Sequence, residues 1–242
     1  MRKCVSGLAA GFAICVLTVS GVQAESVNRV LKDDGPGMAI VPASASGDFA
    51  WQGLYLGASL GGGWGSSTQH YDRAGDHGVA ELEPAGGLAA VSAGYNWRLG
   101  RRLVAGVEAD LGIMNVSEGA TTVFDGHVWS SSFGPLFGTV RGRAGYLVSE
   151  DLLAYATAGL ALANIDDTSI GNTPGETAME NGMRAGFAVG FGAEYAMNEV
   201  WTLKAEFLHM DFGEVSGQST NAEDYSFENS VSILRVGANI AF

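Results

Sequence analysis

The chain has 242 residues, of which 47 % are hydrophobic, 16 % are charged and 36 are glycine. This hydrophobic content excludes disorder, because such a chain can bury enough apolar surface to fold. The formal net charge of −13 argues against nucleic acid and anionic lipid surfaces as partners, since both are bound by clustered Lys and Arg.

Residues 1–24 are predicted to be a secretory signal peptide. A basic start precedes the largely apolar stretch 5–19, and Ala24 provides a small residue for cleavage before Glu25. An apolar core of this length is too short for a membrane span. Both cysteines of the chain fall inside the segment, so the mature protein is expected to have no disulfide and no cysteine-based metal site.

Residues 25–50 are expected to form a periplasmic leader or linker without a core of its own, because they contain two prolines and a run of small residues. No later stretch has the roughly 18 consecutive apolar residues of a transmembrane helix. If the chain sits in a membrane, it therefore does so as a closed barrel, in which neighbouring strands satisfy every backbone polar group.

Eight segments of 51–242 are predicted to be β-strands. The last segment shows the pattern best, since every second residue from Leu234 to Phe242 is apolar and the residues between them are polar or small. A period of two places successive side chains on opposite faces of a strand. The same pattern, weaker in the first and fifth segments, predicts strands near 51–65, 89–98, 103–113, 136–146, 152–163, 183–195 and 201–210.

The connections between these segments alternate in length. Tight turns at one rim and long loops at the other are typical of outer-membrane barrels. The predicted fold is therefore all-β: an eight-stranded antiparallel up-and-down transmembrane β-barrel over 51–242, with four long extracellular loops. The short connections are 100–102, 149–151 and 197–199, and the long ones lie near 67–84, 116–132, 164–181 and 213–228.

Within the strands, the charged side chains fall on the face opposite the apolar one. A Lys or Arg that faces lipid at the bilayer midplane costs about 2–4 kcal/mol, so the apolar face is predicted to meet lipid. The charged face then lines the interior, where buried charges need partners. The alternative role for these charges is a proton or ion path through the interior. The alternative fold, a soluble lipocalin-like barrel, would have an apolar interior and a polar outer surface. The predicted interior charge network consists of Glu108, Asp110, Arg141, Arg143, Arg184, Glu194, Lys204, Glu206 and Arg235.

Most of the remaining acidic residues lie in the four long connections. Solvated, antigenic loops are the simplest interpretation, and weak binding of divalent cations beside lipopolysaccharide is the alternative, since carboxylates suit hard cations. His70, Tyr71, His77 and His127 lie in or near these connections without the spacing of a metal site. No triad or phosphate-binding loop is evident, so we predict no catalytic, cofactor or metal site.

Three motifs stand out: Trp51-x-Gly53-x-Tyr55-x-Gly57 with the Gly61 to Gly65 run, Arg141-x-Arg143-x-Gly145-Tyr146 before Leu153-x-Tyr155-x-x-x-Gly159, and the terminal strand. Together they resemble the small outer-membrane β-barrel family. Phe242 ends a terminal strand that is similar to the signal read by the barrel assembly machinery. The likeness covers 51–242 and is closest to the alphaproteobacterial surface-antigen branch, which includes hemin-binding members.

The resemblance implies an integral protein of the Gram-negative outer membrane that contacts lipopolysaccharide and serves envelope integrity or acts as a host-facing antigen. It implies no catalytic residues. The alternative function is a hemin or other ligand receptor, or an adhesin, that uses the loop residues named above. A small porin is a further alternative, which an eight-stranded monomer argues against.

Overall fold

The computed structural model describes residues 51–73, 76–123, 127–170, 177–219 and 224–242, so the predicted signal peptide and leader lie outside the described residues. None of the described residues forms a helix of the length and hydropathy needed to cross a membrane. The strands are β1 (Gly53–Arg73), β2 (Asp76–Leu82), β3 (Ala85–Arg98), β4 (Leu103–Val123), β5 (His127–Leu147), β6 (Leu152–Ile170), β7 (Thr177–Ala196), β8 (Trp201–Gln218) and β9 (Asp224–Ala241).

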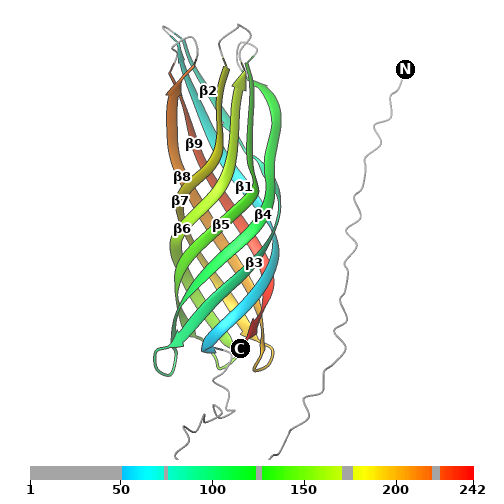
Figure 1. Cartoon of the computed structure of the whole chain (residues 1–242), viewed down its shortest axis with the longest axis vertical. Coiled ribbons are helices and arrows are strands. Elements are labelled where there is room, and N and C mark those ends of the chain that lie inside the picture. The colour runs from blue at the N-terminus through cyan, green and yellow to red at the C-terminus, as the bar shows by residue number, and fades with distance from the viewer. Residues whose placement is uncertain (1–50, 74–75, 124–126, 171–176, 220–223) are drawn as a thin grey trace, which may run out of the picture. The chain divides into compact units, whose positions relative to one another are not determined.

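The strands form one antiparallel sheet that closes on itself, and they wind obliquely around the barrel (Figure 1). Ladders join neighbours in the order β1, β3, β4, β5, β6, β7, β8 and β9, and β9 pairs back with β1. The short strand β2 pairs with the end of β1 and continues β3 beyond Glu83 and Pro84. The described strands thus close a ring of eight, which confirms the predicted eight-stranded antiparallel barrel.

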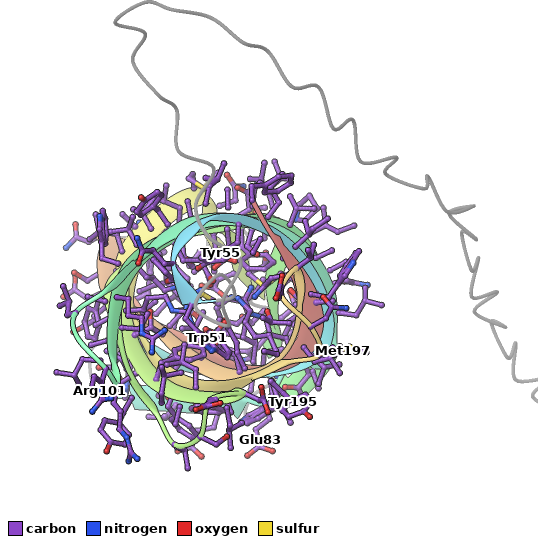
Figure 2. The ribbon with its side chains drawn as sticks, turned by 90° about the horizontal axis from the view of Figure 1, so that it is seen from below. Trp51, Tyr55, Glu83, Arg101, Tyr195 and Met197 are labelled. Atoms are coloured by element: carbon purple, nitrogen blue, oxygen red, sulfur yellow. The ribbon has the colours of Figure 1, made fainter. Side chains whose placement is uncertain are left out.

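Side chains alternate between the interior and the outer wall along the strands. On β5, Val140 is 64 % exposed whereas its neighbour Arg141 is 1 % exposed. Seen along the barrel axis, Trp51 and Tyr55 lie inside the ring, and Tyr195 lies at its outside (Figure 2). The apolar face predicted from the period of two is therefore the outer wall, where the structure exposes large hydrophobic side chains.

The strands are longer than a bilayer requires. β4 and β5 each have 21 residues, whereas about 9–11 residues suffice to cross a membrane. The excess lies at the end opposite the short turns, so most of each segment predicted as a long loop is strand. The alternation continues there, but exposed polar residues such as Ser66 and Asp166 replace the apolar ones on the outer wall, as expected where that wall meets water.

The ring is interrupted at this loop end. The ladder between β3 and β4 ends at Ala85 and Ser117, and the ladder between β7 and β8 ends at Phe187 and Asp211. We call the part of the barrel beyond these residues the outer half. There, no ladder within the described ranges joins β2 to β4 or β7 to β8. The outer half is therefore made of two four-stranded sheets, β4-β5-β6-β7 and β2-β1-β9-β8.

Substitution of Val140 by Arg tests whether the outer wall faces lipid. We expect the free energy of unfolding to fall by about 2–4 kcal/mol, because the guanidinium would lie in hydrocarbon near the bilayer midplane. Urea unfolding in phospholipid vesicles, followed by tryptophan fluorescence, measures this change. As a matched control, Val148→Arg in the exposed turn after β5 should cost at most about 1 kcal/mol. Equal losses at both positions would contradict the assignment.

Candidate functional site

Eight charged side chains gather inside the barrel, in what we call the charge cluster. Four are acids and four are bases, and each of these residues is at most 5 % exposed. They come from five strands because inward-facing positions recur every second residue. The members are Glu108 and Asp110 on β4, Arg141 and Arg143 on β5, Glu194 on β7, Lys204 and Glu206 on β8, and Arg235 on β9.

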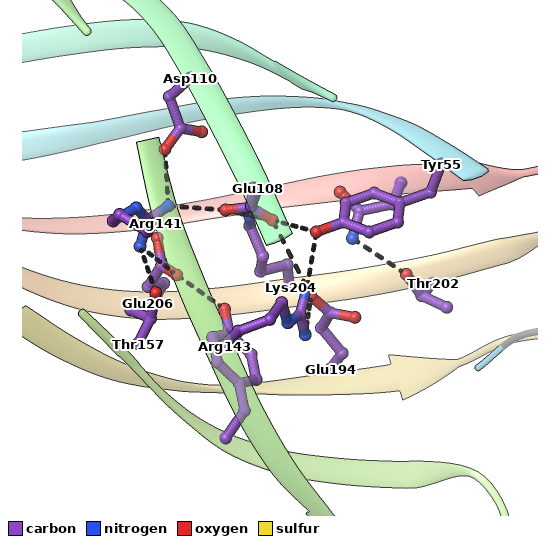
Figure 3. Close-up of polar contacts among 12 residues, drawn as sticks. Tyr55, Glu108, Asp110, Arg141, Arg143, Thr157, Glu194, Thr202, Lys204 and Glu206 are labelled. Atoms are coloured by element: carbon purple, nitrogen blue, oxygen red, sulfur yellow. Dashed lines mark hydrogen bonds and ion pairs between the residues drawn. The ribbon is translucent and has the colours of Figure 1, made fainter. Parts of the chain in front are cut away.

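Arg141 lies at the centre of the charge cluster and contacts three carboxylates (Figure 3). Its Nη2 is 2.6 Å from Glu108 Oε1 and 2.6 Å from Asp110 Oδ2. Its Nη1 is 3.1 Å from Glu206 Oε1. The β4–β5 register places Glu108 directly opposite Arg141, whereas Glu206 on β8 reaches Arg141 across the interior. The guanidinium therefore ties together strands that are not neighbours in the sheet.

Two further bases complete the ion pairs of these acids. Arg235 Nη2 contacts Glu206 Oε2 and lies 3.0 Å from Asp110 Oδ2. Lys204 Nζ lies 2.9 Å from each of the two carboxylate oxygens of Glu108. Charge-assisted hydrogen bonds of this kind are the strong ones in proteins, and every carboxylate named here has at least two cationic partners.

The fourth base, Arg143, contacts two carboxylates, Glu194 and more distantly Glu108, and two tyrosines. Its Nη2 lies 2.9 Å from Glu194 Oε1, and its guanidinium carbon is 4.1 Å from the ring centroid of Tyr155. Its Nη1 donates to the Tyr55 hydroxyl over 2.9 Å, and that hydroxyl donates to Glu108 Oε2 over 2.7 Å. The sequence interpretation named both tyrosines only in the family motifs and did not place them in the charge network, because small residues obscure the alternation in their strands. Their partners across the ladders are small residues, among them Gly94 and Gly145, which leave room for the rings.

Arg184 lies outside the charge cluster, contrary to the prediction. The β6–β7 register pairs Arg184 with Ala163, which places it in the outer half, ten residues before Glu194 along β7. There it forms an ion pair of 2.5 Å with Glu180, and both side chains are partly exposed. Arg184 has the inward parity that the sequence predicted, but the strand extends so far beyond the bilayer that this position is remote from the other charges.

An apolar layer fills the interior on the loop side of the charge cluster. Its buried side chains include Phe133 and Phe137 on β5, Met210 on β8 and Ile233 on β9. These residues have the same inward parity as the charged ones and lie further toward the loop end on the same strands. The sequence interpretation assigned the interior to ionic side chains and did not predict this layer.

A second apolar layer closes the turn end. Trp51 is buried against Val104, Leu147 and Leu153, and its indole Nε1 donates to the backbone oxygen of Glu150 over 2.9 Å. The charge cluster therefore lies between two apolar layers. Packed side chains fill the barrel from the short turns to the outer half.

The remaining predicted residues are scattered. His70 is exposed on β1, whereas the side chains of Tyr71, His77 and His127 lie outside the described part of the structure. Ala24 and Glu25 lie outside it as well. Phe242 is exposed, and its backbone N–H donates to the oxygen of Leu54 over 2.9 Å. Within the described ranges, no three His, Cys, Asp or Glu side chains are placed to hold a metal ion.

An eight-stranded antiparallel barrel with an apolar outer wall, enclosed charges, short turns at one end and long strands at the other is an outer-membrane β-barrel. Comparison with known families agrees with this class. The family model described as "Outer membrane protein beta-barrel domain" matches residues 37–239. The chain belongs to this family.

Individual relatives point to the same compartment. The chain is 33 % identical over 218 residues to the 31 kDa outer-membrane immunogenic protein of Brucella melitensis biotype 1, covering 83 % of this chain and 88 % of the relative. The protein of the same name from Brucella suis biovar 1 matches equally well. The crystal structure of OprG from Pseudomonas aeruginosa is similar in fold, with a TM-score of 0.55 at 14 % identity over 79 % of this chain and 97 % of that one. The predicted outer-membrane antigen family and outer-membrane localisation are confirmed.

Proposed function

We propose that this protein is a non-enzymatic structural and surface-interaction protein of the outer membrane. Its barrel is closed, and its outer half presents two sheets and their loops at the cell surface. The single observation that supports this best is the filled interior, in which a neutral charge cluster lies between two apolar layers. Phe242 is proposed as the residue that the barrel assembly machinery reads.

The filled interior argues against a porin. An eight-stranded barrel is just wide enough for its own side chains, and here Arg141 contacts carboxylates from both sides of the interior. An ion could pass only if such pairs separated. Removing one partner of a buried pair costs about 3–5 kcal/mol, so an open state would be rarely populated.

The outer half supports contact with lipopolysaccharide and recognition as an antigen. Its outer wall exposes carboxylates, among them Asp166, Glu214 and Glu228, which suit the divalent cations that accompany anionic sugars and phosphates. The names of the two Brucella relatives describe immunogenic proteins, which supports a surface that is exposed to a host.

Planar-bilayer recording tests the closed barrel. The purified, folded protein should give no discrete conductance steps, because the charge cluster and the apolar layers block the interior. A porin inserted into the same bilayer serves as the control for detection. Reproducible single-channel steps from the wild-type protein would contradict the proposal.

A further inference from the structure

A group of oxygen-bearing side chains lies between the two sheets of the outer half. We call it the oxygen cluster. It is remote from the charge cluster, and its residues are between 0 and 6 % exposed. The members are Ser67 and Gln69 on β1, Ser131 on β5, Asp167 on β6 and Asn229 on β9.

Strand register brings these side chains together. Ser131 lies opposite Asp167 in the β5–β6 ladder, and Ser67 lies opposite Asn229 in the β1–β9 ladder. The Ser131 hydroxyl donates to Asp167 Oδ1 over 2.7 Å, and Asn229 Nδ2 donates to Asp167 Oδ2 over 2.5 Å. Since β6 and β9 belong to different sheets, the second bond crosses the interior. Gln69 makes a similar crossing, because its Nε2 donates to the backbone oxygen of Ser130 over 3.3 Å.

Asp167 is a buried carboxylate whose hydrogen-bond partners are uncharged, and Arg184, the base that acts on it from a distance, is already paired with Glu180. Asp167 is 2 % exposed, and within the described chain its polar partners are Ser131 and Asn229 rather than a Lys or Arg. Its neighbour Asp166 is exposed on the outer wall, so both aspartates lie beyond the part of β6 that faces lipid. Burial raises the pKa of Asp167 above its usual range, against the opposing effects of the two hydrogen bonds and of Arg184. Every carboxylate of the charge cluster, by contrast, has a cationic partner.

Two further oxygens of the cluster lack donors. Gln69 Oε1 and Asn229 Oδ1 are buried and accept no hydrogen bond from the described residues. Native proteins pair nearly all buried polar groups, so each exception calls for a missing partner. A water molecule could donate to both oxygens, but it would leave the charge of Asp167 unbalanced. A cation would satisfy the amide oxygens and the carboxylate together.

We propose that the oxygen cluster binds one hard, singly charged metal cation, with Na⁺ as the best match. Carboxylate and carbonyl oxygens are the ligands that hard cations prefer. One carboxylate balances one positive charge, whereas a divalent ion would leave a net charge buried. The bound ion contacts side chains from both sheets and so holds the outer half together where the ladders between β2 and β4 and between β7 and β8 are missing.

Heat unfolding of the folded full chain in zwitterionic detergent tests this proposal. EDTA removes divalent ions, and NaCl, KCl and choline chloride are compared at an ionic strength of about 0.15 M. The unfolding midpoint should be about 2–4 °C higher in NaCl than in choline chloride, and it should rise further with the logarithm of the Na⁺ concentration. Equal midpoints in NaCl and choline chloride would overturn the proposal and would indicate water or a protonated Asp167 instead.

A matched pair of variants locates the effect. Asp167→Asn keeps the size of the side chain and an acceptor for Ser131 but removes the charge, so it should abolish the difference between Na⁺ and choline. Asp166→Asn changes the exposed neighbour and should retain the full difference. Amide hydrogen exchange, measured in peptides that contain Ser131 or Asn229, reports on the site itself. Na⁺ should slow this exchange in the wild type and in Asp166→Asn, but not in Asp167→Asn. A Na⁺ response that survives in Asp167→Asn, or is lost in Asp166→Asn, overturns the assignment. If Asp167→Asn does not fold, the wild-type comparison of the salts still decides.

Discussion

Replacement of Arg141 by Met lowers the free energy of unfolding by about 3–5 kcal/mol, because three buried carboxylates lose the guanidinium that they share. Arg235 and Lys204 remain nearby, but both are already paired with these acids and do not replace the contacts that Arg141 makes. Urea unfolding in phospholipid vesicles measures the loss. On a gel, the folded band of the unboiled variant should disappear at a lower temperature than that of the wild type.

Arg184→Met is the matched control for this substitution. Arg184, like Arg141, is on the inward-facing side of its strand, but its ion pair with Glu180 is partly exposed. Pairs of this kind contribute about 0–1 kcal/mol. A loss at Arg184 as large as that at Arg141 would contradict the distinction between a buried cluster and a surface pair.

Replacement of Phe133 by Ala should also cost about 3–5 kcal/mol. The ring is fully buried in the apolar layer and lies 6.4 Å, between centroids, from the ring of Phe212. Its removal opens a cavity that the surrounding strands can fill only in part, because each is fixed by its ladders. The same urea titration in vesicles measures the change.

Phe187→Ala provides the comparison on the opposite face. Phe187 is exposed on the outer wall, where acyl chains can occupy the space that the ring leaves. The loss at Phe187 should therefore be clearly smaller than that at Phe133. Similar losses at the two positions would show that the interior layer is not packed as the structure describes.

The sequence predicted the barrel because one physical rule decides the face of each residue. Val140 and Arg141 are adjacent, and a period of two sends the first to lipid and the second to the interior. The same rule gave the correct inward parity of Arg184. It could not give the height of Arg184 along the barrel, which depends on its pairing with Ala163 in a ladder between distant segments.

The outer half could not be predicted for a related reason. Where the wall meets water, polar residues occupy both faces and the alternation of hydrophobicity fades. Asp166 and Asp167 are neighbours with the same side chain, yet the first is exposed and the second is buried between two sheets. Only the β5–β6 ladder and the hydrogen bond from Asn229 across the interior distinguish them, so the oxygen cluster has no signature in the local sequence.

The central claim is that an apolar wall faces lipid around a closed interior. The most direct test measures how accessible spin labels along β6 are to dissolved oxygen. The native cysteines are at positions 4 and 15, so single cysteines at 154–158 can carry spin labels without a thiol elsewhere in the barrel. In lipid vesicles, collision with dissolved oxygen should be high at 154, 156 and 158 and low at 155 and 157, because the even positions face the bilayer. Uniform accessibility along the strand, or a higher value at the odd positions, would contradict the account.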